Sequence, residues 1–261
     1  MSAQSPAPGR LAVSRLAALR DNYIWLLDDG QSALVVDPGE AAPVLAALTA
    51  RRLRLAAILI THHHADHQGG VADLLAAWPQ AQVYAPEQEN IPGCTHPLRG
   101  GERLELLGGE FSVLAVPGHT LGHLAYYHAA ALFCGDTLFG AGCGRLFEGT
   151  PAQMADSLAR IAALPEATLI YCAHEYTEAN LRFAAAVEPD NPEVAERCRR
   201  VAGLRAAAEA SVPSTLAEEK ATNPFLRCRQ PAVLAAAQGQ GAIDTDPVAV
   251  FAALRAWRNN F

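Results

Sequence analysis

The histidine-rich stretch at residues 61–67 is the feature that most constrains how this chain can fold. Its sequence, Thr-His-His-His-Ala-Asp-His, holds four of the nine histidines and one carboxylate. It directly follows an apolar, partly β-branched run at residues 56–60, which is typical of a buried strand. Residues 71–78 then show helical apolar spacing. The cluster is therefore predicted to lie between a strand end and a helix start, where open α/β sheets usually carry their chemistry.

The residue types of this cluster favour a metal site. In an extended turn, His62 and His64 project from the same side of the chain and His63 points away. Asp66 and His67 leave the turn at a different angle, so one short loop can serve two neighbouring cations. Imidazole and carboxylate groups are ligands of zinc, iron and manganese. A purification tag would instead lie at a terminus and lack the interleaved aspartate.

Three later strand ends carry ligands of the same type. They are His119, Asp136 and His174, which follow the strands predicted at residues 110–116, 131–134 and 168–172. Any one of these residues alone would be a weak signal, and their repetition at strand ends is what supports a common site. His123 either supports the site from behind or has a structural role, and the sequence leaves both interpretations open.

The character of the chain changes near residue 175. Strands and helices alternate before this point, and helical spacing dominates after it, with no flexible linker between. We therefore predict an α/β (α+β) fold with domains at residues 1–175 and 176–261. The helices are expected at residues 40–50, 70–78, 151–163, 177–187, 192–210, 231–238 and 246–257.

Composition excludes several classes of function. The chain is 51% hydrophobic and 18% charged, with a net charge of −7, which argues against a nucleic-acid binder. No run of about 18 apolar residues is present, so no membrane partner is expected. The N-terminus has no apolar signal core, and the six cysteines show no metal or redox spacing. We expect a cytoplasmic monomer that keeps its thiols reduced and acts on a small molecule.

Four further segments join the metal motif in a family pattern. They are Gly135-Asp136-Thr137-Leu138-Phe139, Gly142-Cys143-Gly144-Arg145, His174-Glu175-Tyr176-Thr177 with Asn180, and Asn223-Pro224-Phe225-Leu226-Arg227. Together with Thr61-His62-x-His64-x-Asp66-His67, they resemble the glyoxalase II (hydroxyacylglutathione hydrolase) family of the metallo-β-lactamase superfamily. The segments span most of the chain. The metal motif indicates only the superfamily, and the Asn-Pro-Phe-Leu-Arg loop is the more specific signal.

The resemblance implies an αββα sandwich followed by a C-terminal helical domain that helps to form the substrate pocket. It also implies two divalent metal ions, with zinc expected and iron or manganese as alternatives. One ion would be held by His62, His64 and His119, the other by Asp66, His67 and His174, with Asp136 as the bridge between them.

The implied reaction is hydrolysis of S-(2-hydroxyacyl)glutathione thioesters. S-lactoylglutathione would give lactate and glutathione, the second step of methylglyoxal detoxification. A hydroxide bridging the two metals would attack, so Asp66, which can orient it, and the bridging Asp136 are the predicted catalytic residues. The predicted glutathione contacts are Arg145, Tyr176, Asn180 and Arg227. Phe147 stands where some relatives have a tyrosine.

Other functions compatible with the metal motif differ in what else they require. A secreted β-lactamase would need an export signal, and that family lacks a bridging aspartate at position 136; a lactonase is the related alternative. A nuclease should have a basic face and an added domain. A persulfide dioxygenase uses a single iron and does not need the second ligand set. A metal-bound regulatory module without catalysis is an alternative from a different class, and it is disfavoured because the ligand set is complete, whereas losing a single ligand carboxylate would suffice to abolish catalysis.

Overall fold

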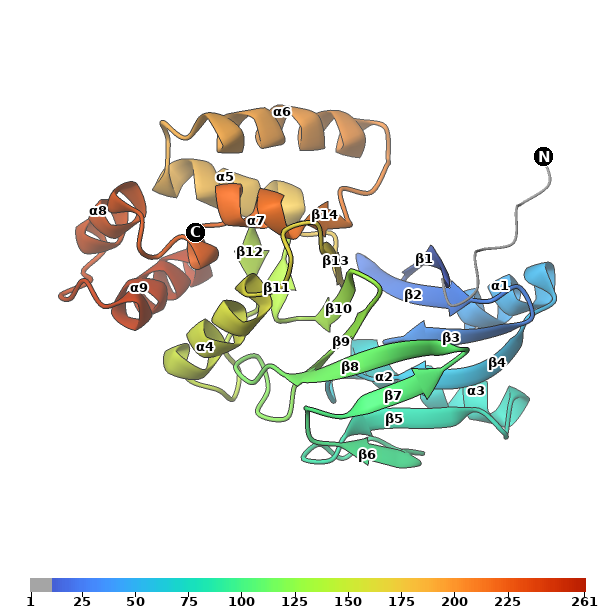
Figure 1. Ribbon diagram of the computed structural model, residues 1–261. Coiled ribbons are helices and arrows are strands. Elements are labelled where there is room, and N and C mark those ends of the chain that lie inside the picture. Colours follow the sequence, from blue (N-terminus) through green and yellow to red (C-terminus); the bar gives the residue numbers. More distant parts are fainter. Residues whose placement is uncertain (1–10) are drawn as a thin grey trace. The chain divides into compact units, whose positions relative to one another are not determined.

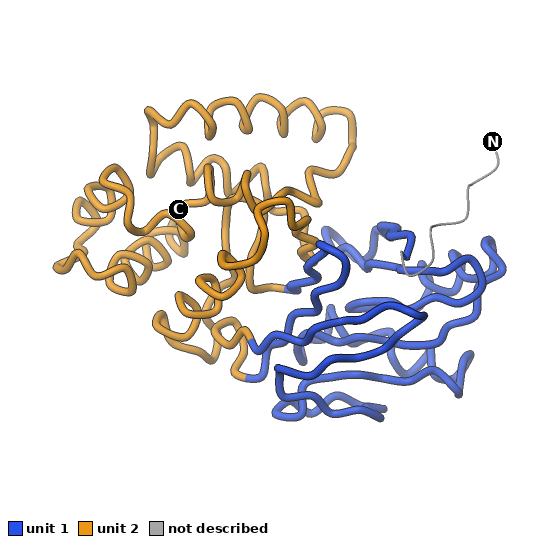
Figure 2. The backbone as a smooth tube through the Cα atoms, viewed as in Figure 1, with its two compact units in different colours: residues 1–115, 122–135 blue, residues 116–121, 136–261 orange. Residues whose placement is uncertain are grey.

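The computed structural model describes residues 11–261 and shows two six-stranded sheets, one two-stranded sheet and flanking helices (Figure 1). The first ten residues, where the sequence lacks a signal core, lie outside the described part. In the described part, no helix has the length and apolarity needed to cross a membrane. The chain forms two compact units (Figure 2). Unit 1 comprises residues 1–115 and 122–135, and unit 2 comprises residues 116–121 and 136–261.

The first sheet of unit 1 has the strand order β1-β2-β3-β4-β5-β6. Its strands are β1 (Ala12–Ala18), β2 (Asn22–Asp28), β3 (Ser32–Val36), β4 (Arg54–Leu59), β5 (Gln82–Pro86) and β6 (His96–Leu98). Strands β1, β2 and β3 pair antiparallel, whereas β3 to β6 run parallel. The parallel pairs need crossover connections, which contain α1 (Ala42–Arg51), the short α2 (Ala65–Gln68) and α3 (Val71–Ala77).

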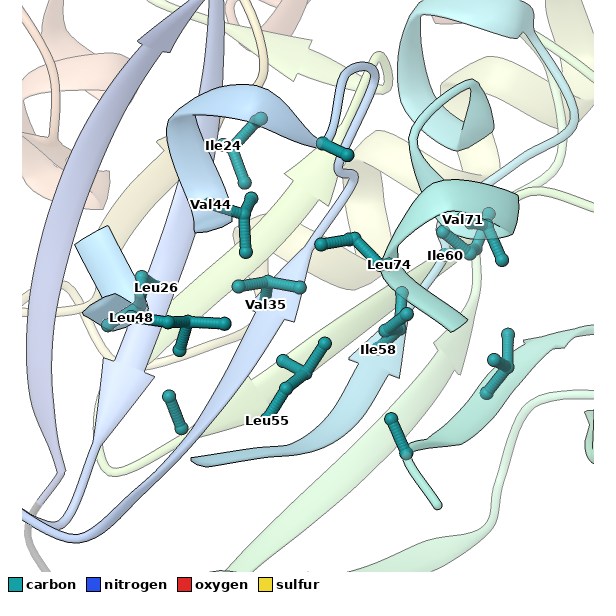
Figure 3. Close-up of a cluster of buried hydrophobic side chains, with 14 of the residues drawn as sticks. Ile24, Leu26, Val35, Val44, Leu48, Leu55, Ile58, Ile60, Val71 and Leu74 are labelled. Carbon is teal, nitrogen blue, oxygen red and sulfur yellow. The ribbon is translucent and has the colours of Figure 1, made fainter. Parts of the chain in front are cut away.

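The core of unit 1 lies between this sheet and its helices (Figure 3). Strand residues such as Ile24, Val35 and Ile58 pack in one cluster with Val44 of α1 and Leu74 of α3. The alternate residues of the same strands are buried as well. A strand that is covered on both faces reads as a continuous apolar run, which is why residues 56–60 carry no charge.

The second sheet contributes four antiparallel strands to unit 1. They are β7 (Arg103–Leu106), β8 (Gly109–Ala115), β9 (Leu124–His128) and β10 (Ala131–Gly135). Tyr126 of β9 is fully buried, and its hydroxyl donates to Ile60 O at 2.7 Å. Burial raises the pKa of Tyr126 well above its usual value. This bond fixes the last residue before the histidine cluster.

Unit 2 carries the helical region and several short strands. Its elements are β11 (Leu138–Phe139), β12 (Gly142–Cys143), α4 (Pro151–Ala162), β13 (Leu169–Cys172), α5 (Thr177–Val187), α6 (Pro192–Ala206), β14 (Ser214–Thr215), α7 (Leu216–Thr222), the 3-10 turn η1 (Pro224–Leu226), α8 (Pro231–Gly239) and α9 (Pro247–Asn259). Capping side chains set several helix starts: Thr150 forms a capping box, and Asn191 and Asp246 accept backbone N–H bonds. Helices α5 and α6 lie side by side (Figure 1).

The structure adds elements that the periodicity did not predict. One of them is the three-residue strand β6, which pairs with β5 at the edge of the first sheet. Helix α7 is only 7 residues long and interrupts a segment without clear apolar spacing. The helix expected at 192–210 ends at Ala206. The domain boundary at residues 175 and 176 stays a prediction.

Candidate metal centre

Four of the seven predicted ligands lie in unit 1, on the turn that leads from β4 into α2. His64 keeps an extended backbone, which leaves His62 and His64 on one side with His62 Nε2 2.9 Å from His64 Nδ1. Ligand nitrogens of His62 and His67 lie within 4.8 Å of each other, and both side chains are fully buried. Asp66 Oδ2 lies 3.5 Å from His67 Nε2. The turn therefore gathers three imidazoles and one carboxylate.

The other two histidines near this turn have different surroundings. His63 Nδ1 lies 3.2 Å from Glu89 Oε2, so this side chain pairs with a carboxylate that is not a predicted ligand, and its ring meets the His64 ring edge-on at 5.0 Å between centroids. His123 is fully buried and stacks on His62, with ring centroids 4.6 Å apart and an interplanar angle of 18°. The supporting role for His123, one of the two left open by the sequence, is the one that this packing favours.

Asp37, at the end of β3, holds the turn from behind. Its carboxylate accepts from Thr61 N at 2.8 Å and Thr61 Oγ1 at 2.7 Å, and it lies 2.9 Å from His67 Nδ1. This contact fixes the His67 ring with Nε2 toward Asp66. Asn22 Nδ2 donates to Asp66 Oδ2 at 2.9 Å. Such partners behind a ligand orient it and raise its affinity for a metal.

The three remaining predicted ligands lie in unit 2 around Asp136. Its Oδ2 atom lies 3.4 Å from His119 Nε2, and its Oδ1 atom lies 3.4 Å from His174 Nε2. All three side chains are buried. Each carboxylate oxygen thus faces a different imidazole, which is the arrangement that a bridging ligand needs.

His119 is oriented by the loop that follows Asp136. Its Nδ1 atom lies 2.7 Å from Arg145 O, so Nε2 is the nitrogen turned toward Asp136. Gly144 makes this approach possible, because a Cβ atom there would lie 2.0 Å from Asp136 O. A side chain at position 144 would push the loop away from both ligands.

The donor atoms fit divalent metal ions. Two ligand atoms at about 2.1 Å from one ion, at a tetrahedral angle, lie about 3.4 Å apart. The three imidazole–carboxylate pairs above are separated by 3.4 to 3.5 Å. Buried imidazole and carboxylate groups suit zinc, iron and manganese. The buried His and Asp clusters therefore have the composition and spacing of a metal site.

Two aromatic rings pack against predicted ligands of unit 2. Phe147 is 60% exposed and meets His119 edge-on at 5.2 Å between centroids. Tyr176 is 36% exposed and stacks on His174 at 4.7 Å and 7°. The predicted substrate contact Tyr176 thus lies beside a predicted ligand. Partly exposed rings in this position offer an apolar surface to a substrate.

Four arginines of unit 2 lie near one another: Arg145, Arg182, Arg255 and Arg258. Burial lowers the pKa of Arg258, and the charges of Arg255, Arg182 and Arg145 lower it further. Within residues 11–261, none of these four guanidinium groups has a carboxylate partner. Arg255 and Arg258 were not singled out from the sequence, although they stand three residues apart on one helix. An electropositive cluster of this kind suits an anionic ligand.

Asn180 is buried, and both ends of its amide bond to protein. Its Nδ2 atom donates to Gly140 O at 3.0 Å, and its Oδ1 atom accepts from Arg258 Nη2 at 3.2 Å. This amide therefore links the loop after Asp136 to the arginine cluster, and its contact with substrate stays a prediction.

Arg227 is engaged elsewhere in unit 2. Its Nε and Nη2 atoms donate to the two oxygens of Glu188 at 2.7 and 2.9 Å, and Nη1 donates to Lys220 O at 3.0 Å. The residue lines a cavity of about 680 Å³ formed by α4, η1 and the start of α9. Arg145, Tyr176 and Asn180 do not line this cavity. Arg227 therefore lines a cavity that the other three predicted substrate contacts do not line, and its contact with substrate stays a prediction.

Comparison with known proteins identifies relatives over most of the chain. Residues 18–174 match the model of the Metallo-beta-lactamase superfamily, and residues 175–261 match Hydroxyacylglutathione hydrolase C-terminus. A hydroxyacylglutathione hydrolase of Dechloromonas aromatica (strain RCB) is 63% identical, over 96% of this chain and 100% of that protein.

Two solved structures share the fold. The crystal structure of ETHE1 from Myxococcus xanthus has a TM-score of 0.65 and 25% identity, covering 95% of this chain and 98% of that one. The structure of TTHA1623 in a di-iron-bound form has a TM-score of 0.59 and 29% identity, covering 81% of this chain and 98% of that one.

Proposed function

This chain belongs to the hydroxyacylglutathione hydrolase family of the metallo-beta-lactamase superfamily, and we propose that it hydrolyses S-(2-hydroxyacyl)glutathione thioesters, S-lactoylglutathione among them. The family and the αββα fold with a helical C-terminal region, both expected from the motifs, are confirmed. The observation that carries the proposal is the pair of carboxylate contacts made by Asp136, because they place one oxygen toward each of two imidazoles. A cytoplasmic location and a monomeric state stay predictions.

The proposal assigns the ligands of both units to one centre with two divalent ions. His62, His64 and His119 would hold one ion, Asp66, His67 and His174 the other, and Asp136 would contribute one oxygen to each. Zinc is the proposed ion; iron is the alternative that a di-iron relative supports, and manganese suits the same ligands. Bound ions would lower the pKa of a water molecule toward neutrality and polarise the thioester carbonyl.

The protein's own groups would orient the reactants. Asp66 receives a hydrogen bond from Asn22 on Oδ2 and is positioned to accept one from the attacking water. Asp37 and the Arg145 carbonyl keep His67 and His119 in the tautomers that turn Nε2 toward the carboxylates. The thiolate of glutathione is a good leaving group, so the reaction needs no strong general acid.

Three of the four substrate contacts are proposed near the arginine cluster of unit 2, and Arg227 is proposed as a separate contact. Arg145, supported by the surrounding arginines, would bind a glutathione carboxylate, and Tyr176 would pack against the peptide. Asn180 would act through its remaining N–H. Arg227 has two N–H donors left beyond its bonds to Glu188 and Lys220, and these are the ones available to a carboxylate. The domain division at residues 175 and 176 is part of this proposal.

Steady-state kinetics on four substrates test the proposed function. We expect kcat/KM for S-lactoylglutathione to exceed that for an acyl thioester of a simple thiol by about 10–100-fold. This is the factor for one lost hydrogen bond to a charged group, about 1.5–3 kcal/mol. Arg145→Ala should raise KM for S-lactoylglutathione and so reduce this ratio of kcat/KM values, since the arginine would bind the ground state and the transition state about equally. Arg199→Ala, an exposed arginine of α6, is the matched control.

A homoserine lactone and a penicillin complete the comparison. A preference for either would contradict the thioesterase assignment and leave the metal site intact. Equal rates on both thioesters would remove the glutathione pocket from the proposal, and Arg145 would then be an ordinary surface residue.

A further inference from the structure

The loop from Asp136 to Arg145 has two tasks in the proposed centre but little regular structure of its own. It positions the carboxylate of Asp136, and it supplies the Arg145 carbonyl that orients His119. Its only regular elements are the two-residue strands β11 and β12. At the turn between them, Ala141 has a φ of +54°, a conformation that costs free energy for a residue with a side chain. Something outside the loop must therefore hold it.

The helical region supplies this support through side-chain bonds to five consecutive residues of the loop. Phe139 O and Gly142 O accept from Asn223 Nδ2 at 3.3 and 2.9 Å, Gly140 O accepts from Asn180 Nδ2 at 3.0 Å, Ala141 N donates to Glu219 Oε2 at 2.8 Å, and Cys143 O accepts from Arg255 Nη1 at 2.8 Å. The four side chains come from α5, α7, the residue after α7, and α9, and all are at least nine-tenths buried. A buried backbone group left without a partner is costly, so these bonds select one loop conformation.

Glu219 and Asn223 form the centre of this support. Both are fully buried, and Asn223 Nδ2 lies 3.1 Å from Glu219 Oε2. Glu219 Oε1 accepts from Arg197 Nη2 at 2.5 Å and from Ser214 Oγ at 2.6 Å, which compensates its charge. The carboxylate is therefore fixed in place and can hold the Ala141 N–H rigidly.

We propose that Glu219 and Asn223 are positioning residues for metal binding, acting through the 136–145 loop. This inference rests on the proposed function, because it assumes that Asp136 and His119 bind metal. Neither residue contacts the ligands. They fix the backbone that carries Asp136 and places the Arg145 carbonyl on His119, so a disturbance at α7 should reach the metal affinity.

The test is the variant Asn223→Asp, which keeps the shape of the side chain. Its Oδ1 atom can still accept from Phe225 N, as Asn223 does. The second oxygen, however, replaces a donor and faces two carbonyls and the Glu219 carboxylate. We expect the metal affinity of the chelator-treated protein, measured by competition with a chromophoric chelator, to fall by about 10–100-fold. After the variant has been reconstituted with metal, its kcat should be lower than that of the wild type. Its KM for the acyl thioester of a simple thiol should stay within about twofold of the wild-type value, since Asn223 touches no substrate.

Asn191→Asp is the matched control. Asn191 caps α6 through Oδ1, and its Nδ2 atom donates to Ala221 O of the same α7 at 3.1 Å, but it makes no contact with the loop. The Asn191→Asp protein should bind metal with the same affinity as the wild type. The inference would be overturned if the Asn223→Asp protein bound metal as tightly as the wild type. It would also be overturned if the metal affinity fell equally in Asn223→Asp and Asn191→Asp, because the effect would then come from any disturbance of α7. A wild type that binds no metal would instead refute the proposed function.

A second measurement keeps the inference testable should Asn223→Asp fail to fold. Hydrogen exchange of the wild-type protein should show the Ala141 amide exchanging as slowly as amides in the middle of α5, because its acceptor is buried and fixed. Exchange of Ala141 at the rate of an exposed loop amide would show that the helical region does not hold the loop, and would overturn the inference.

Discussion

Asp136→Ala should abolish turnover, with a fall in kcat/KM of at least about 1000-fold, or about 4 kcal/mol of transition-state stabilisation. The two oxygens of Asp136 face two different imidazoles, at 3.4 Å each. The alanine variant would lack the negative charge that the two proposed ions share. It would also lack the carboxylate that would hold them at a fixed separation. Binding of both ions should weaken in parallel, as measured by chelator competition.

Asp156→Ala is the control for this substitution. Asp156 is an exposed carboxylate of α4 that pairs with Arg160 one turn along the same helix. Its removal should leave rate and metal content unchanged, since exposed pairs contribute about 0.2–1 kcal/mol to stability and nothing to this site. If Asp136→Ala kept two tightly bound ions and a near-normal rate, Asp136 would not be the bridge.

Arg197→Ala should lower the free energy of unfolding by about 3–5 kcal/mol, the scale for breaking a buried ion pair by removing one partner. Glu219 is fully buried, and Arg197 is its cationic partner, with a second bond from Nη1 to Thr222 Oγ1 at 2.6 Å. The alanine would leave the carboxylate charged or force it to take up a proton. Chemical denaturation of the chelator-treated protein measures the loss without a contribution from bound metal.

Arg199→Ala provides the comparison on the same helix. Arg199 and its partner Glu196 are both exposed, so this variant should lose no more than about 1 kcal/mol. Equal losses for Arg197→Ala and Arg199→Ala would mean that the buried pair contributes no more than a surface pair.

The sequence predicted the elements whose signal is local. The unbroken apolar run at residues 56–60 indicated a buried strand, and β4 ends at Leu59. Helix α5 has the predicted bounds, because its apolar face repeats at helical spacing over three turns. His62 and His64 meet because the backbone stays extended at His64, as the period of two required.

The parts that the sequence did not predict depend on partners far along the chain. Asp37 stands 30 residues before His67, and a lone aspartate after a strand can have many roles. Its place at a strand end, which it shares with the predicted ligands, is the signal that could have identified it. Helix α7 lacks an apolar stripe because its central residue, Glu219, is buried with Arg197 rather than exposed. A charged residue in the interior is the case that periodicity cannot recognise. The ion pair between Arg227 and Glu188 likewise could not be predicted from the sequence, because the two residues stand far apart in the chain.

The metal content of the purified protein tests the central claim most directly. Elemental analysis should give two divalent ions per chain, and titration of the chelator-treated protein with zinc should restore S-lactoylglutathione hydrolysis up to two equivalents. The proposed ligand set of His62, His64, Asp66, His67, His119, Asp136 and His174 would suffice for two ions that share one carboxylate. Binding that saturates at one equivalent with full activity, or hydrolysis that persists without metal, would contradict the account.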